Sequence, residues 1–353
     1  MPVSFARPVI KREERMLWIH AGPHKAASSY VAERSRKNRK AVPAQAVLLD
    51  VDDSPSNAIL QKHYEPLEQA LVTLPKGLHR VLLSNSSFDT RILKKSVLIP
   101  LRDLAASHGF KLGVSYFIRD QQSWLNSIYC HRIRRFRETP DFSEYCDYIM
   151  NDRDSWDIAY PSKFKVFKFF PDITTLFLPL SSQIATSDLF LALVEALDLD
   201  SPEGGDGWLK GESSKQNIQP GAKGIWMSRL CRQLIDELGF DCERLARKGK
   251  VIRDLAIELG WDRDRFDGFD QDLLNRVAGF YQESNEAFAQ EHWGVSWQQL
   301  FPPQPASPSI YAGPHSPDEV LEMRRLMVRV IRGLHLPWRL RGQYFKLYDA
   351  VIA

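Results

Sequence analysis

The stretch Leu17–Tyr30, LWIHAGPHKAASSY, joins an apolar run to a short loop and the start of a helical pattern. The apolar run, Met16–His20, has the length and composition of a buried strand. Gly22 permits a tight turn after it, and the small residues of Ala26–Ser28 leave backbone N–H groups open at a helix N-terminus. Lys25 adds a mobile positive charge. The stretch therefore predicts a strand, an anion-binding loop and a helix in succession.

Apolar runs rich in β-forming residues alternate with stretches of helical spacing through the first half of the chain. This alternation predicts an α/β fold, a doubly wound parallel sheet in three layers, with helices on both faces. Ligands of such sheets bind beyond the carboxyl ends of the strands. The expected strands are Met16–His20, Ala46–Asp50, Val81–Ser84, Leu112–Ile118 and Ile173–Pro179. The expected helices are roughly Ala26–Arg39, Asn57–Leu74, Pro100–Ser107, Gln121–Arg135 and Phe142–Met150.

The C-terminal half is mainly helical in pattern. The proline-rich segment Phe301–Pro317 indicates a linker, after which Ser316 as N-cap and Pro317 at the first helical position predict a last helix. Earlier helices are expected over Ser187–Leu197, Pro220–Leu238, Cys242–Leu259 and Asp270–Glu291. We expect an N-terminal extension over residues 1–15, a main domain over 16–300, and a linker with a basic helical tail over 301–353.

Composition excludes several classes of protein. A net charge of +3 over 353 residues gives no reason to expect a nucleic-acid partner. No run approaches the ~18 apolar residues of a membrane helix, and no apolar leader is present, so a cytoplasmic protein is expected. The four cysteines show neither C-x-x-C spacing nor histidines at zinc-ligand intervals. They predict reduced thiols and no metal site.

The segment Gly22–Ser29, GPHKAASS, resembles the 5′-phosphosulfate loop of sulfotransferases that use 3′-phosphoadenosine 5′-phosphosulfate (PAPS). The family pattern is G-x-x-K-[TS]-[GA]-[TS]-[TS], and Ala26 departs from it by lacking a hydroxyl. The resemblance implies that Lys25 is catalytic and neutralises charge on the bridging oxygen as the nucleotide leaves. It implies that the 5′-phosphosulfate is bound by Gly22, Pro23, His24, Lys25, Ala26, Ala27, Ser28 and Ser29.

A second element agrees with the same family. The fourth expected strand ends at Arg119, and Ser127 follows eight residues later on the next helix. Sulfotransferases hold the 3′-phosphate of the nucleotide with an Arg and a Ser at this spacing. A guanidinium and a hydroxyl suit a terminal phosphate. The resemblance therefore assigns Arg119 and Ser127 to the 3′-phosphate.

Weaker matches extend the resemblance from about Leu17 to Phe301. Val81–Ser84 is similar to a third strand that ends in Ser near the acceptor, and Lys215–Gln219 to an Arg-x-Asn-x-Ser element. Asn285–Phe288 is similar to the closing pattern of the family. Together these matches imply a bacterial, carbohydrate-sulfotransferase-like protein with a P-loop NTPase-like fold. PAPS would be its co-substrate, with no metal, because the sulfuryl group carries a single negative charge.

The general base and the acceptor stay open. Many carbohydrate-type members place a Glu two residues after the strand-three Ser, but this chain has Ser86 there. The base for a hydroxyl or amine acceptor is therefore Asp89, His24 or His131. Asp89 is favoured because it alone lies in the loop leaving the third strand. The acceptor is a small molecule, a carbohydrate or a lipid.

Two other functions compete with sulfuryl transfer. Val47–Asp50 is an apolar strand that ends in an acid, as in a magnesium-binding Walker B element, which favours another P-loop kinase or NTPase. Against it, Lys25 lacks the Gly that precedes the lysine of a Walker A loop. The missing Glu at Ser86 favours instead a catalytically inactive nucleotide-binding homologue.

Two basic segments have structural or functional interpretations. Arg247–Lys250 superficially resembles a late Arg-Lys-Gly element of cytosolic sulfotransferases, but its surroundings differ and a solvated charge run is expected. Met323–Gly333 carries an apolar stripe with arginines mostly elsewhere. It predicts either a helix docked on the protein or peripheral contact with a membrane surface or an acidic partner.

Overall fold

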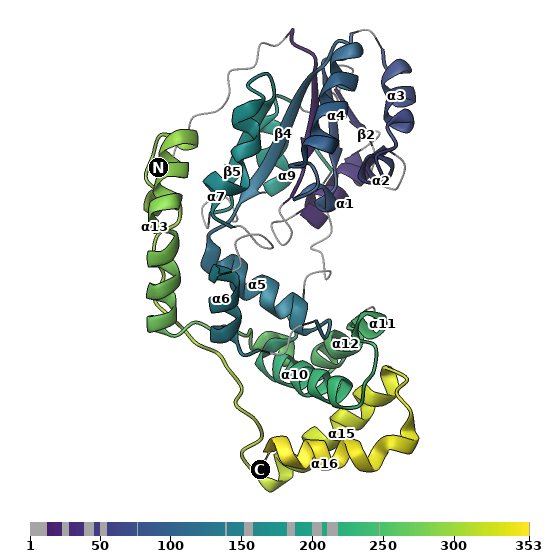
Figure 1. Ribbon diagram of the computed structural model, residues 1–353, viewed down its shortest axis with the longest axis vertical. Helices are drawn as coiled ribbons and strands as arrows, with labels where there is room; N and C mark the ends of the chain where they lie inside the picture. The colour runs from purple at the N-terminus through teal and green to yellow at the C-terminus, as the bar shows by residue number, and fades with distance from the viewer. Residues whose placement is uncertain are drawn as a thin grey trace. The chain divides into compact units, whose positions relative to one another are not determined.

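The structure, a computed structural model, describes residues 13–22, 28–38, 46–49, 55–75, 77–137, 140–151, 158–181, 188–199, 207–209, 218–246 and 248–352. The chain divides into two compact units (Figure 1). Unit 1 comprises Met1–Gln121, Asp154–Ser214 and Tyr281–Pro303. Unit 2 comprises Gln122–Arg153, Lys215–Phe280 and Gln304–Ala353.

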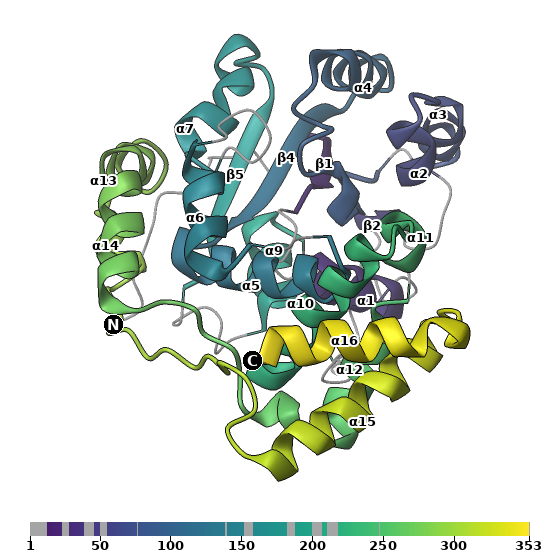
Figure 2. The same ribbon diagram turned by 60° about the horizontal axis from the view of Figure 1, so that its bottom comes forward.

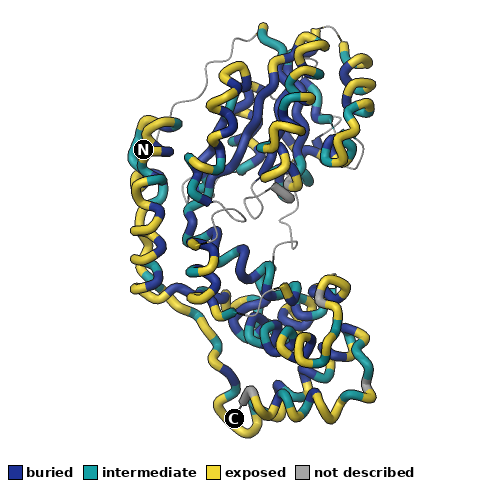
Figure 3. Tube along the Cα trace, viewed as in Figure 1, coloured by how far each residue is buried: buried dark blue, intermediate teal, exposed yellow. Residues whose placement is uncertain are grey.

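Unit 1 is built on a parallel sheet of five strands in the order β2-β3-β1-β4-β5. The α/β fold and the five expected strands are confirmed. Every residue of the central strand β1 is buried, in keeping with a parallel sheet covered on both faces (Figure 3). The strands are β1 (Met16–His20), β2 (Ala46–Leu49), β3 (Arg80–Ser84), β4 (Lys111–Ile118) and β5 (Thr174–Pro179).

Helices cover both faces of the sheet. On one face, Trp18 packs with Val31 of α1 (Ser28–Asn38) and Phe190 of α9 (Leu189–Ala196). On the other, Leu17 and Ile19 belong to a core to which several helices contribute. These include α3 (Glu65–Val72), α4 (Lys95–Ser107), α7 (Tyr160–Lys163) and the C-terminal part of α13 (Gln271–Trp293). Because side chains alternate along β1, the strand contributes to two separate cores, one on each face of the sheet.

The crossover connections single out the carboxyl end of β1. The chain leaves β1 through α1 on one face of the sheet, whereas the connections from β3 to β4 and from β4 to β5 include α4 and α7 on the other face. Neighbouring strands whose connections run on opposite faces create a crevice at their carboxyl ends. The switch point of this sheet therefore lies around β1, where the predicted phosphate loop begins.

Three expected helices differ from the observed ones. The range Asn57–Leu74 holds two helices, α2 (Pro55–Leu60) and α3, because Lys62 turns the chain with a φ of 65° and Pro66 restarts the helix. The helix expected from Pro100 begins earlier, at Lys95, and runs through the proline. The range Cys242–Leu259 also holds two helices, α11 (Cys242–Ala246) and α12 (Lys250–Glu258).

Unit 2 is helical and has an apolar core. Its helices include α5 (Gln121–Ile133, of which Gln121 belongs to unit 1), α6 (Phe142–Asn151), α10 (Gly221–Glu237), α11, α12, α15 (Pro317–Gly333) and α16 (Arg341–Ile352). Figure 2 shows α15 and α16 side by side. Gly249, before α12, lies so close to this unit's Arg134 carbonyl oxygen that a Cβ would come within 2.5 Å of it. A side chain at position 249 would therefore displace the backbone.

The C-terminal helix α15 is docked on this core. Its side chains Met323, Met327 and Val330 are buried with residues of α10 and α12. Ser316 is the N-cap, its side chain accepting a hydrogen bond from the backbone N–H of Glu319 at 3.2 Å. The interpretation as a docked helix is confirmed, and contact of its arginines with a membrane or an acidic partner stays a prediction.

The structure also bears on the thiols and on membrane insertion. Cys130, Cys146 and Cys231 are buried in unit 2, and burial raises the pKa of Cys146 and of Cys231 to about 12. The Cys146 and Cys231 thiols are therefore protonated at physiological pH. None of the helices in the described part of the chain is long and apolar enough to cross a membrane.

Candidate functional site at the carboxyl edge of the sheet

The backbone after β1 stays paired with β4 beyond the end of the strand. The Ala21 N–H donates to the Ser115 carbonyl at 2.9 Å, and the Gly22 carbonyl accepts from the Phe117 N–H at 3.1 Å. Gly22 has a φ of 115°, which L side chains rarely adopt. Gly22 therefore has the backbone conformation that the expected turn requires of a glycine, and α1 begins at Ser28.

Most of the predicted phosphate loop lies outside the described residues. This applies to Pro23, His24, Lys25, Ala26 and Ala27, and to the side chains of Ser28 and Ser29. Their assignment to the 5′-phosphosulfate stays a prediction.

His20, the last residue of β1, forms a buried pair with the last residue of β3. Its Nδ1 lies 2.8 Å from the Ser84 hydroxyl oxygen, and the two residues are register partners in the sheet. His20 is fully buried and Ser84 is 6% exposed. Burial lowers the pKa of His20 to about 3, so the imidazole is neutral at physiological pH. His20 was not predicted as a site residue, although a histidine at the end of an otherwise apolar strand is visible in the sequence.

The loop after β3 is fastened to β1. The Asn85 N–H donates to the His20 carbonyl at 3.2 Å, and the Asn85 side chain accepts from the Ser87 N–H at 2.9 Å. This contact starts a short 3-10 helix, Ser86–Phe88, which leads to Asp89. The candidate acceptor loop thus begins beside the central strand, as expected.

Asp89, the favoured candidate base, is engaged by a lysine. Its carboxylate lies 2.8 Å from Nζ of Lys163 on α7, with side-chain exposures of 17% and 9% respectively. Its backbone carbonyl accepts a hydrogen bond from the Tyr116 hydroxyl at 2.8 Å. Lys163 was missed because nothing in the sequence links α7 to this loop. An acceptor would meet Asp89 as one half of an ion pair.

Arg119 follows β4 at the same edge of the sheet and is partly buried. Its carbonyl accepts a hydrogen bond from the hydroxyl of Tyr160, whose pKa is raised by burial. The neighbouring Leu180 N–H donates to the Ile118 carbonyl at 2.6 Å. These contacts fix the backbone at Arg119.

The other two predicted residues on α5 belong to unit 2. Ser127 and His131 are both partly buried. Nδ1 of His131 lies 3.5 Å from Nη2 of Arg134, the limit of a weak hydrogen bond. The structure therefore gathers Gly22, Asp89 and Arg119 at one edge of the unit 1 sheet, and it holds Ser127 and His131 in the second unit.

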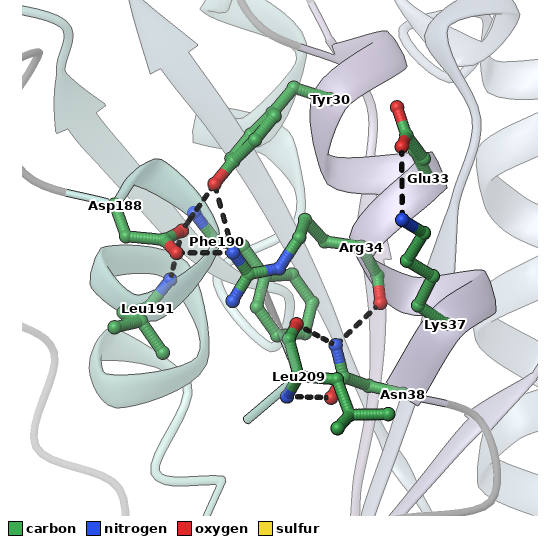
Figure 4. A network of polar contacts seen from close by, with 9 residues as sticks. All are labelled: Tyr30, Glu33, Arg34, Lys37, Asn38, Asp188, Phe190, Leu191 and Leu209. Carbon is green, nitrogen blue, oxygen red and sulfur yellow. Dashed lines mark hydrogen bonds and ion pairs between the residues drawn. The ribbon is translucent and has the colours of Figure 1, made fainter. Parts of the chain in front are cut away.

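The helix that follows the loop is anchored by a buried ion pair (Figure 4). Arg34 of α1, 1% exposed, pairs through Nη1 with the carboxylate of Asp188, which also accepts from the Tyr30 hydroxyl at 2.8 Å. Asp188 caps α9 by accepting from the Phe190 N–H at 3.0 Å. Farther along α1, Asn38 exchanges two hydrogen bonds with the backbone of Leu209. This network, which was not predicted from the sequence, fixes α1 from its first turn to its last.

Neither a scan against protein-family models nor a search of curated proteins finds a match to the chain. Among the residues that the structure describes, no group of three or more His, Cys, Asp or Glu side chains could hold a metal ion.

Proposed function

We propose that the protein is a PAPS-dependent sulfotransferase with a P-loop NTPase-like unit 1. One observation carries the proposal. The motif Gly22–Ser29 starts at the carboxyl end of the central strand, at the switch point of the sheet, and Arg119 ends the adjacent strand. Anionic ligands of parallel sheets bind at this place, where a loop enters the N-terminus of a helix. Support thus comes from two motifs at one edge.

The proposed chemistry is positioning and charge stabilisation. Sulfuryl transfer resembles phosphoryl transfer, in which groups aimed at the developing charge supply most of the rate enhancement. Lys25 would neutralise the bridging oxygen as 3′-phosphoadenosine 5′-phosphate leaves, and Arg119 would bind the 3′-phosphate. Ser127 is the predicted partner of Arg119 in that task. The network around Arg34 would keep α1 from shifting as charge builds up at its N-terminus.

Nucleotide selectivity tests the proposal without knowledge of the acceptor. We expect 3′-phosphoadenosine 5′-phosphate to raise the melting temperature without magnesium, since a ligand at a hundredfold excess over its Kd adds about 2.7 kcal/mol. ATP lacks the 3′-phosphate and should stabilise much less. Arg119→Ala should remove the difference between the two nucleotides. Arg102→Ala, which breaks the ion pair with Asp103 on α4, is the control. Equal stabilisation of the wild type by ATP would overturn the assignment of Arg119.

Turnover tests the catalytic half of the proposal. The protein should transfer labelled sulfate from PAPS to components of a cell extract or a panel of hydroxyl and amine compounds, detected as a sulfate mass shift. Binding of the nucleotide without any transfer would favour the inactive homologue, and Ser86 in place of Glu together with the engaged Asp89 favours it too. Nucleotide binding that needs magnesium would favour a kinase or NTPase with Asp50 as metal ligand; Asp50 lies outside the described residues.

The general base needs variants that keep the fold intact. Asp89→Ala leaves Lys163 with an unpaired charge in a nearly buried position, so loss of activity could follow from local unfolding. Asp89→Asn and Lys163→Gln are better matched. If Asp89 is the base, Asp89→Asn loses turnover and keeps nucleotide binding, whereas Lys163→Gln keeps turnover. Full activity of Asp89→Asn would leave His24 or His131 as the candidate base, and alanine variants of these two residues would then test them.

A further inference from the structure

The His20–Ser84 pair has the spacing of a nucleophile and its base. A serine hydroxyl within 2.8 Å of an imidazole nitrogen is the usual arrangement for an activated nucleophile. Two observations exclude that role here. His20 has no measurable exposure, and among the described residues its buried Nε2 has no hydrogen-bond partner, so within this part of the chain no third group orients the ring as a carboxylate would.

The surroundings of His20 contain no ionisable group among the described residues. Its register partners are Ser84 on β3 and Ser115 on β4, and its ring meets Phe117 edge to face at 5.5 Å between centroids. Desolvation alone therefore lowers the pKa of His20, with no charged neighbour contributing. The ring stays neutral across the physiological range, with one N–H donor and one acceptor nitrogen.

A neutral imidazole in a closed pocket is a fixed hydrogen-bond partner. A free serine hydroxyl rotates among three positions, but a partner at 2.8 Å that itself cannot turn selects one of them. His20 cannot turn because Phe117 and the neighbouring strands pack around it. The Ser84 hydroxyl is therefore held in one orientation at the start of the candidate acceptor loop.

We propose that His20 is a positioning residue, a neutral hydrogen-bond partner that holds the Ser84 hydroxyl in one orientation at the start of the candidate acceptor loop. This inference rests on the proposed sulfotransferase function for its acceptor, but the pair itself does not. The sheet register places Ser84 beside the central strand, and Asn85 then ties the loop to the His20 carbonyl. His20 thus holds the last side chain of β3 through its ring and the first loop residue through its backbone.

The first experiment observes the pair in the intact chain. Magnetic resonance of isotope-labelled histidine nitrogens should show His20 as one neutral tautomer from about pH 8 to about pH 5. Ser84→Ala should shift Nδ1 of His20 while the ring stays neutral. Titration of His20 in this pH range, or an Nδ1 chemical shift that is the same in Ser84→Ala as in the wild type, would overturn the proposal.

The second experiment links the pair to turnover with labelled PAPS and the acceptor panel. His20→Asn keeps an amide near the position of Nδ1, whereas His20→Phe keeps the ring contact with Phe117 and removes the hydrogen bond. We expect His20→Asn to stay close to wild type, and His20→Phe to fall about fivefold to tenfold in turnover with nucleotide binding unchanged. Equal activity of the two variants would refute the positioning role. If the wild type itself transfers no sulfate, the proposed function fails, but the magnetic resonance experiment still tests the hydrogen bond between His20 and Ser84.

Discussion

Unit 1 buries polar and charged side chains, whereas unit 2 buries almost none. Among the described residues, the buried polar side chains other than Ser228 all belong to unit 1. Ser228 bonds only to the Gly224 carbonyl of its own helix, at 2.7 Å. The unit 1 set is His20, Arg34, Ser35, Asn38, Ser56, Arg80, Ser84, Ser115, Gln121, Ser181 and Asn285.

This difference concerns groups whose burial is costly. A buried polar group costs free energy unless it is fully hydrogen-bonded. Among the described residues, both units leave some buried side-chain atoms without a hydrogen-bond partner, and in unit 1 these include Nε2 of His20, Nε of Arg34 and Oγ of Ser115. The polar residues that are buried as a whole are nevertheless concentrated in unit 1, and His20, Ser84 and Ser115 are register neighbours on the face of its sheet that holds α1.

The largest expected effect comes from the ion pair that anchors α1. Asp188→Asn still caps α9 and still meets Tyr30, but it leaves the guanidinium of Arg34 buried without a counter-charge. Such a change costs about 3–5 kcal/mol of unfolding free energy. Asp236→Asn is the matched change in unit 2, where Asp236 pairs with Arg232 one helical turn away at 2.7 Å. That exposed pair should contribute about 0.3–0.5 kcal/mol. Urea denaturation measures both variants, and similar small losses would contradict the contrast between the units.

The catalytic comparison concerns two lysines. Lys25→Ala in the unit 1 loop should lower turnover by roughly two to three orders of magnitude, as loss of a transition-state donor does. Lys250→Ala, at an exposed position of unit 2, should leave turnover unchanged. Steady-state rates with labelled PAPS check both. Near-normal turnover of Lys25→Ala would remove the phosphate loop from the mechanism.

The sequence predicted those parts of unit 1 that depend on local patterns. The five strands follow from short apolar runs, and Gly22 follows from the tight turn that a loop between strand and helix needs. The helix break at Pro66 was equally local, and it was overlooked because the apolar spacing of Asn57–Leu74 continues through it. Periodicity reports which face of a helix is apolar and not whether the helix is continuous.

The polar contacts at the candidate site could not be predicted in this way. Arg34 meets Asp188 across 154 positions of sequence, and His20 meets Ser84 across 64. Such pairs depend on strand order and on how helices pack, which a single sequence does not specify. Asp89 is an example. The sequence shows that it lies in the loop after the third strand, but it does not show that Lys163 is its ion-pair partner. Local chemistry predicted the place of the site and left its hydrogen-bond partners open.

The pH dependence of the unfolding free energy should differ between the buried His20 and an exposed histidine. His20 has a pKa of about 3 in the folded protein and of about 6.5 in the unfolded chain. Between these two pH values the unfolded chain binds a proton at His20 that the folded protein does not bind. The contribution of His20 to stability is therefore complete above about pH 6.5 and declines as the pH falls toward 3. At about pH 5 the loss is about 2 kcal/mol.

The measurement is the unfolding free energy of wild type and His20→Asn between about pH 7.5 and pH 5. The variant should lose about 2 kcal/mol less than wild type over that range. His63→Asn, at an exposed position of unit 1, is the control for removing a histidine. Parallel curves for wild type and His20→Asn would mean that His20 takes up a proton in the folded protein.

The smallest expected effect tests whether the units differ in ordinary helix stabilisation. Ser316 caps α15 in unit 2, and Ser296 caps α14 (Trp297–Leu300) in unit 1, where it forms a capping box with Gln299. Each side chain accepts a backbone N–H that would otherwise lack a partner at a helix start. Replacing either serine by Ala should cost about 1 kcal/mol, and replacing it by Gly a few tenths. Thermal unfolding of the four variants measures this. Comparable losses at both caps would show that the units share the same local stabilisation, so that their difference lies in the buried polar groups. A loss confined to one unit would mean that the contrast extends to helix termini and does not single out the edge of the sheet.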